Sequence, residues 1–389
     1  MNKWVAISII SVLAVGIVVA GVLCAQEKRN ISTLEAGQAT LEADLADTEA
    51  EVSTLEAHLA TLEADLADAK AEVSTLKAHL ATLGAVLTTT EDEALTPETE
   101  LALVPFFPDA NLEAAIREAI DKPEGTITKS DLEPLTALVV QNIGISDLTD
   151  LEYCVNLRWL VLEHLKIDDI SPLAGLTNLE EIHIQDNNIS DISALANLTN
   201  LYFLHIADNN ISDISALAGL TDLQWLTLWD NNISDISALA NLTNLKELRL
   251  SGNEISDISA LAGLTKLEEL WILNNNISDI SALANLADLK ELRLAGNDIS
   301  DTSTLVGLTK LLGLDLDSNN INDISALADL TDLKWLDLHN NNISDISALV
   351  LNSGLSAGDS VFLKNNPLSA TSINVYIPHL QAMGIHVEY

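Results

Sequence analysis

Leucine and isoleucine recur with a fixed spacing through residues 138–366. The recurring phrase, LxxLxLxxNxI, has a period of 22 residues, and one copy has its fixed residues at Leu245, Leu248, Leu250, Asn253 and Ile255. Because side chains alternate across a strand, the LxL part of each phrase predicts a short strand with one buried face. The arc that follows predicts a short helical turn. Stacked repeats bury one continuous core, so the pattern predicts a solenoid of about 11 coils.

An asparagine closes eight of these phrases, at Asn187, Asn209, Asn231, Asn253, Asn275, Asn297, Asn319 and Asn341. An amide both donates and accepts hydrogen bonds, so it can satisfy backbone groups that water does not reach. We therefore predict a structural column that hydrogen-bonds the main chain of neighbouring coils.

A second column consists of aspartates, at Asp191, Asp213, Asp235, Asp257, Asp279, Asp301, Asp323 and Asp345. Short polar acceptors are favoured at turns and helix starts, which predicts a capping role. The alternative is a ladder of calcium sites, since stacked carboxylates attract hard cations. The glycine-rich nonapeptides of calcium-binding solenoids do not occur in the sequence, which disfavours this alternative.

The phrase resembles the leucine-rich repeat, specifically the 22-residue bacterial kind found in internalin-like surface proteins. The resemblance covers residues 105–389. It implies an α/β fold, a leucine-rich repeat solenoid with a parallel β-sheet on the concave face and short helical or 3-10 arcs on the convex face. It also implies a role in protein recognition. It does not identify the partner, because the contact residues vary within the family.

A helical cap is expected over residues 105–137, before the first coil at residue 138. Asp109 is the expected N-cap of a helix that runs to Ile120 with apolar residues along one face. Internalin-like proteins have a similar cap, and a solenoid needs one to cover the end of its core. The first two coils keep the apolar rhythm but lack the closing asparagine, as terminal repeats often do.

At the other end, the frame slips by three residues before the last coil, which closes at residue 366. Residues 367–389 predict a C-terminal cap: a helix toward Met383, ended by Gly384, and a final strand at residues 385–389. Eleven coils at about 4.8 Å each predict a sheet about 50 Å long.

Large aromatic and basic residues occupy the places between the leucines, which point to the open face of the predicted sheet. All five tryptophans after the amino-terminal segment lie there. Exposed tryptophan has no folding role, and tryptophan, tyrosine and arginine dominate binding hot spots. The expected ligand-binding residues are Tyr202, Phe203, His205, Trp225, Trp229, Arg249 and Trp271. Secondary candidates are Trp159, His183, Arg293 and Trp335.

Two other interpretations of these columns exist. The aromatic rings can stabilise the sheet by stacking along a column, as Phe203 and Trp225 can. His183 and His205 suggest a metal site, but the columns do not obviously supply the further ligands that it needs. We therefore expect no metal.

Residues 4–23 form an uncharged apolar run of 20 residues, long enough to cross about 30 Å of hydrocarbon as a helix. This predicts a single-pass anchor in the cell membrane, with the bulk of the chain outside the cytoplasm. One alternative is a cleaved signal peptide, followed by secretion. Another is acylation of Cys24, although Val22 and Leu23 are bulkier than the residues that such signals carry.

Apolar residues in residues 31–87 alternate in steps of three and four. A strip two residues in seven wide predicts a coiled-coil stalk rather than a helix that lies on a surface. At about 1.5 Å per residue the rod is about 85 Å long. We expect it to form a homo-oligomer, whose order the sequence leaves open. Residues 88–104 lose the heptad and predict a linker.

The formal net charge is −40, which argues against nucleic acid as a ligand. This charge either keeps the chain soluble or attracts basic partners. Cys154 has no partner further along the chain, so no disulfide framework is expected in the exported part. The sequence contains no phosphate loop, HExxH, CxxC or GxSxG motif, so we expect neither an enzyme nor a cofactor.

Together these patterns predict a membrane-anchored, exported protein that binds another protein through its concave face. A carbohydrate or cell-wall ligand is the first alternative, because tryptophan platforms beside acids and amides also suit glycans. A structural surface protein without a specific ligand is the second.

Overall fold

The computed structural model describes residue 105, residues 107–142 and residues 144–389, which fall within one compact unit, Glu100–Tyr389. Among these residues, no helix has both the length and the apolar composition needed to span a bilayer. Three predicted segments lie outside the described residues: the membrane helix, the coiled-coil stalk and the linker, at residues 4–23, 31–87 and 88–104.

Within the described part of the chain, two helices precede the first strand, α2 (Ala110–Ala119) and α3 (Lys129–Leu132). Asp109 is the N-cap of α2, as predicted, because its Oδ1 accepts from the backbone N–H of Asn111 at 2.9 Å. Its Oδ2 accepts from the backbone N–H of Ser146, so the same carboxylate joins the helix to the first coil.

Among the residues that the structure describes, twelve parallel strands follow one another in chain order and form one sheet. They are β1 (Ala137–Gln141), β2 (Trp159–Glu163), β3 (Glu181–His183), β4 (Phe203–His205), β5 (Trp225–Thr227), β6 (Glu247–Arg249), β7 (Glu269–Trp271), β8 (Glu291–Arg293), β9 (Gly313–Asp315), β10 (Trp335–Asp337), β11 (Ser360–Phe362) and β12 (His386–Glu388). The predicted solenoid with a parallel sheet is therefore confirmed.

Strand register follows the sequence period. From β1 to β10, paired residues are 22 apart, as in Leu204 with Leu226. Trp335 of β10 instead pairs with Ser360 of β11, and this longer step reflects the slip of three residues in the frame. Each sequence column therefore becomes a row of neighbouring side chains across the sheet.

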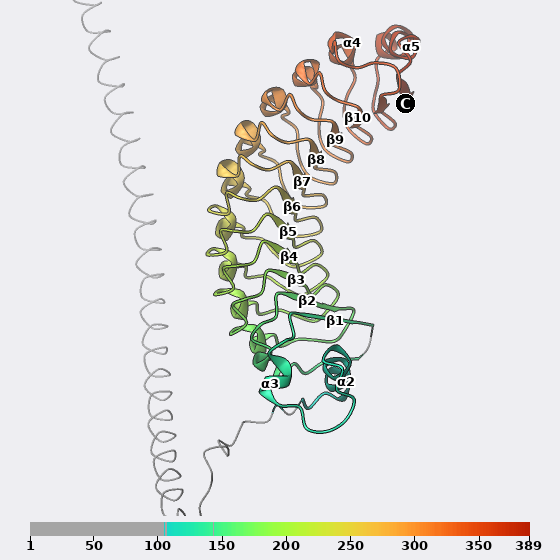
Figure 1. Ribbon diagram of the computed structural model, residues 1–389. Helices are drawn as coiled ribbons and strands as arrows, with labels where there is room; N and C mark the ends of the chain where they lie inside the picture. Colours follow the sequence, from blue (N-terminus) through green and yellow to red (C-terminus); the bar gives the residue numbers. More distant parts are fainter. Residues whose placement is uncertain (1–104, 106, 143) are drawn as a thin grey trace, which may run out of the picture. The chain divides into compact units, whose positions relative to one another are not determined.

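Short helical turns return the chain from one strand to the next, and Figure 1 shows them stacked along the outer edge of the curved repeats. Nine are 3-10 turns: η1 (Leu151–Tyr153), η2 (Ser171–Leu173), η3 (Ser193–Leu195), η4 (Ser215–Leu217), η5 (Ser237–Leu239), η6 (Ser259–Gly263), η7 (Ser281–Asn285), η8 (Ser303–Gly307) and η9 (Ser325–Asp329). The last coils use α4 (Ser347–Leu351), the π-helical η10 (Ser372–Tyr376) and α5 (Ile377–Ala382).

The aspartate column starts these turns. In all eight members, Oδ1 accepts from the backbone N–H of the serine two residues later at 2.8 Å. Backbone hydrogen bonds of this kind favour the charged carboxylate, and that of Ser259, the largest cause, lowers the pKa of Asp257. Each aspartate lies one residue before the N-cap of its helical turn and forms the turn that leads into it, so the predicted role at turns is confirmed.

The asparagine column lies inside, at 5–8% exposure. Asn253 is representative: its Oδ1 accepts from the backbone N–H of Ile233 at 3.0 Å, and its Nδ2 donates to the carbonyls of Leu228 and Leu250 at 3.0 Å each. The amides therefore join successive coils, as the sequence predicts.

The residue before each asparagine of the column has a left-handed backbone conformation, with positive φ, which the sequence analysis did not predict. Asp186, Asp208 and Asp230 have φ between 51° and 53°, and Gly252 has 67°. Aspartate, asparagine and glycine tolerate this conformation best, which explains why they dominate this place.

Candidate functional site

The candidate residues lie on the open face of the sheet, in the alternation that the strands impose. In β4, for example, Phe203 and His205 are partly exposed while Leu204 between them is buried. Of the five tryptophans expected to be exposed, only Trp159 is so, at 48% exposure. The other four candidates are partly buried because their rings pack on side chains of neighbouring coils.

Seven of these residues form what we call the aromatic patch: Tyr202, Phe203, His205, Trp225, Trp229, Arg249 and Trp271. Within it, the Trp225 ring lies 6.0 Å from Tyr202 in an edge-on arrangement and 6.5 Å from Phe203. His205 lies 6.4 Å from Trp229. These separations suit aromatic pairs, so stacking along the columns takes place and fixes the rings in position.

The patch continues toward the carboxyl end through alternating arginine and tryptophan. The guanidinium of Arg249 lies 3.9 Å from the centre of the Trp271 ring, and that of Arg293 lies 6.0 Å from the same ring. Arg293 also lies 4.2 Å from the ring of Trp335. Cation–π contacts therefore connect the patch with two of the secondary candidates.

Carboxylates flank this row. Arg249 pairs with Glu247 at 2.6 Å, and Arg293 pairs with Glu291 at 3.2 Å. The hydroxyl of Tyr202 donates to Glu181 at 3.1 Å. Burial, with Glu247 nearby, raises the pKa of Glu269. The surface thus places apolar rings beside charges of both signs.

Phe362 belongs to the same face, although the sequence columns did not include it. Its ring lies 6.0 Å from Trp335, 5.6 Å from His339 and 6.0 Å from His386. The slip of the frame before β11 removes Phe362 from the 22-residue period. Extending the register by three residues would have identified it.

His183 and His205 have a third potential metal ligand that sequence reasoning missed. Glu163, from the neighbouring strand, brings a carboxylate oxygen into a group whose donor atoms all lie within 4.8 Å of one another. Glu163 occupies the seventh place of its phrase and the histidines the fifth, so no single column contains all three. A similar group consists of Asp317, Asp337 and His339.

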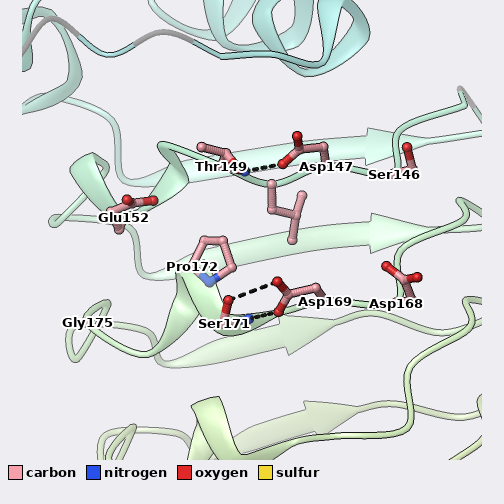
Figure 2. A pocket seen from close by; sticks show the side chains of 10 residues that line it. Ser146, Asp147, Thr149, Glu152, Asp168, Asp169, Ser171, Pro172 and Gly175 are labelled. Atoms are coloured by element: carbon pink, nitrogen blue, oxygen red, sulfur yellow. Dashed lines mark hydrogen bonds between the residues drawn. The ribbon is translucent and has the colours of Figure 1, made fainter. Parts of the chain in front are cut away.

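The outer side of the coils contains hollows of a different kind. Figure 2 shows one of about 510 Å³, where Asp147 and Asp169 accept from the backbone N–H groups of Thr149 and Ser171. Its lining residues are Ser146, Asp147, Leu148, Thr149, Glu152, Asp168, Asp169, Ser171, Pro172 and Gly175. Similar hollows recur between later turns, so this one is part of the periodic groove between coils.

Comparison with known proteins agrees with this geometry. The family model described as "Leucine-rich repeat region" matches residues 131–382. No curated protein sequence matches the chain.

Among solved structures, an internalin of Listeria monocytogenes (InlF) is 35% identical, with a TM-score of 0.53, over 73% of this chain and 96% of that one. Internalin C2 of the same species is 36% identical, with a TM-score of 0.51, over 56% of this chain and 94% of that one. A plant peptide hormone receptor, RGFR1, in complex with RGF2, is 20% identical, with a TM-score of 0.50. The match covers 62% of this chain and 49% of the receptor chain.

The family model covers more than half of the chain, and the InlF match spans nearly all of that internalin. The receptor adds only a likeness of fold. From its repeats, its sheet and these matches, the chain belongs to the leucine-rich repeat family.

Proposed function

We propose that this protein is a binding protein that recognises a protein partner through the aromatic patch on the open face of its sheet. Leucine-rich repeat proteins mediate protein–protein interaction, and the fold is typically a binding scaffold rather than an enzyme. The observation that carries the proposal is the patch itself: partly exposed rings, fixed by contacts across four coils.

The physical argument concerns preorganisation. Ordering a free aromatic or arginine side chain costs about 0.5–1.5 kcal/mol on binding. In the patch, neighbouring coils already hold the rings of Trp225 and Trp271, so a partner meets a surface that is ordered beforehand. Rigid aromatic and arginine anchors of this kind dominate binding energy in protein interfaces.

Anchoring and assembly belong to the same proposal. Residues 4–23 would hold the protein in the cell membrane, with the repeats on the extracytoplasmic side, and residues 31–87 would join copies into a homo-oligomer. Several patches on one oligomer would then bind a multivalent surface more strongly than one patch does.

The test is capture of partners from cell-surface extract by the full chain, beside the triple variant Trp225→Ala, Trp229→Ala, Trp271→Ala. A matched control removes exposed apolar side chains from the outer turns, Val306→Ala with Leu351→Ala. The proposal expects the patch variant to lose the captured partner and the control to keep it, while circular dichroism shows both folded.

Digestion of the extract identifies the class of ligand. Protease treatment should abolish capture if the partner is a protein, whereas glycan-degrading enzymes should abolish it if the ligand is a carbohydrate. Equal capture by the patch variant and the full chain would place the binding site elsewhere and refute the proposal.

A further inference from the structure

Three side chains on the amino-terminal part of the open face converge in a way that protein recognition does not require. They are Glu163 of β2, His183 of β3 and His205 of β4, which we call the two-histidine group. Their donor atoms lie within 4.8 Å of one another. The Nδ1 atom of His183 lies 3.7 Å from Oε1 of Glu163.

A second set of contacts orients this group. Nε2 of His183 lies 2.7 Å from Oε1 of Glu181, a distance at which its N–H donates to the carboxylate. Oε2 of Glu163 accepts from Nε2 of Gln141 at 2.6 Å. Metal-binding histidines commonly donate their other ring N–H to a carboxylate, and metal-binding carboxylates are themselves hydrogen-bonded.

The orientation leaves a specific imbalance. In the tautomer whose Nε2–H donates to Glu181, the lone pair of Nδ1 faces the carboxylate of Glu163. Two electron-rich atoms that face each other repel unless a cation lies between them. A metal ion provides that cation.

The second histidine of the group, His205, has a ring nitrogen that is not hydrogen-bonded. Its Nε2 atom is buried, and no group in the described part of the chain hydrogen-bonds it. A buried polar atom without a partner destabilises a fold, so native proteins rarely contain one without a reason. Burial disfavours the charged form of this ring, and a neutral imidazole can coordinate an ion.

Aromatic contacts hold both rings. His183 stacks on Phe203 with a centroid distance of 4.7 Å and an interplanar angle of 25°, and His205 packs beside Trp229. The rings therefore need little ordering when an ion binds, which favours affinity.

We propose that Glu163, His183 and His205 bind a divalent late transition-metal ion, with Zn²⁺ as the expected ion. Two imidazoles and one carboxylate form a common three-ligand zinc set, which leaves a fourth position for water or another ligand. Imidazole nitrogens favour such metals over Ca²⁺ and Mg²⁺, which prefer oxygen. Tetrahedral zinc with bonds of about 2.1 Å holds its ligand atoms about 3.4 Å apart, so binding draws the three groups slightly closer.

Zinc binding to the untagged full chain tests the proposal, by equilibrium dialysis with metal analysis at micromolar Zn²⁺. The full chain should bind Zn²⁺ with at least tenfold higher affinity than Glu163→Gln or His205→Gln. Glu163→Gln keeps the size of the side chain and an oxygen for Gln141. Glu181→Gln removes the carboxylate that orients His183 and that also accepts from Tyr202, and it should weaken binding about tenfold.

Two histidine variants control for other sites. His164→Gln removes an exposed histidine that pairs with Asp186, and His339→Gln removes the histidine of the Asp317 group. Both should leave the high-affinity Zn²⁺ site intact. Binding of Co²⁺ should produce visible absorption bands that Glu163→Gln abolishes, a readout that does not depend on the folding of the His205 variant.

Absence of micromolar Zn²⁺ binding, or equal affinity of Glu163→Gln and the full chain, would overturn the proposal. These outcomes are independent of the partner capture that tests the aromatic patch.

Discussion

A single asparagine in this fold makes four hydrogen bonds, two of which cross to the preceding coil. Asn253 donates to three carbonyls and accepts from the backbone N–H of Ile233. The carbonyls of Leu228 and Leu250 also accept from Asn231 and Asn275, whereas the N–H of Ile233 depends on Asn253. The stability that Asn253 contributes therefore depends mainly on the backbone N–H of Ile233, rather than on the carbonyls that accept from Asn253.

We predict that Asn253→Ala destabilises the fold by about 1–3 kcal/mol, because it leaves the buried N–H of Ile233 without a partner. Urea unfolding followed by tryptophan fluorescence measures the change. Asn232→Ala is the matched control: its side chain is exposed in the neighbouring coil, and the expected change is within about 0.5 kcal/mol. Equal stability of Asn253→Ala and the control would disprove the structural role of the column.

His205 gives the stability a specific dependence on pH. Its pKa falls from 6.5 to about 4 on folding, so the unfolded chain takes up the proton first as the pH falls. The contribution of His205 to the free energy of unfolding should therefore decrease as the pH falls from about 6.5 to 4, and stay constant at lower pH. Solvent screening of a partly buried ring reduces the expected loss to about 2 kcal/mol.

The measurement compares the full chain with His205→Gln across this range, in the presence of a chelator so that metal does not contribute. Other groups titrate in both proteins, so the difference isolates His205. Parallel curves for the two proteins would contradict the assignment.

One coil is the smallest unit that the sequence describes well. Its strand, its capped turn and its asparagine follow from residue types at fixed places, as with Asp257 and Asn253, because buried backbone groups admit few partners. Contacts between coils on the open face were harder to predict. Glu163 reaches His183 diagonally, and the direction of a long side chain depends on its neighbours rather than on its own column.

Thr302 departs from the column of isoleucines that packs beneath the outer turns. It is 3% exposed, and its hydroxyl donates to the carbonyl of Asp323 at 2.9 Å. Ile280 and Ile324 occupy the same place in the adjacent coils with 2% exposure, so the packing accommodates the larger side chain.

We predict that Thr302→Ile stabilises the protein by about 0.5–1 kcal/mol. Two additional buried carbons contribute about 1.6 kcal/mol, and the lost hydrogen bond costs about 1 kcal/mol. Thr302→Val separates these effects, since it loses the hydrogen bond with little added volume and should destabilise. A lower urea midpoint for Thr302→Ile would mean that the η8 turn is too tight for isoleucine.

The chain as a whole carries a large negative charge. The net charge of −40 spreads over a chain with 58 acids and 18 bases, so self-repulsion opposes the folded state. The sequence predicted this total directly. It did not reveal that Arg249 and Arg293 are held between tryptophans and glutamates, because that arrangement depends on the register of four strands.

We predict that the melting temperature rises between about 10 mM and 150 mM NaCl, because the screening length falls from about 30 Å to about 8 Å. Tetramethylammonium chloride at equal ionic strength should have the same effect. A rise with CaCl₂ that greatly exceeds the ionic-strength effect would instead support calcium sites along the aspartate column.

The register of 22 residues also determines how such a surface can change over generations. Insertion or deletion of 22 residues adds or removes a complete coil, and every remaining strand keeps its partner register. The open face would then lengthen or shorten in steps of about 4.8 Å. Groups built from adjacent coils, such as Glu163 with His183 and His205, keep their geometry, while the distance between such groups becomes a heritable variable.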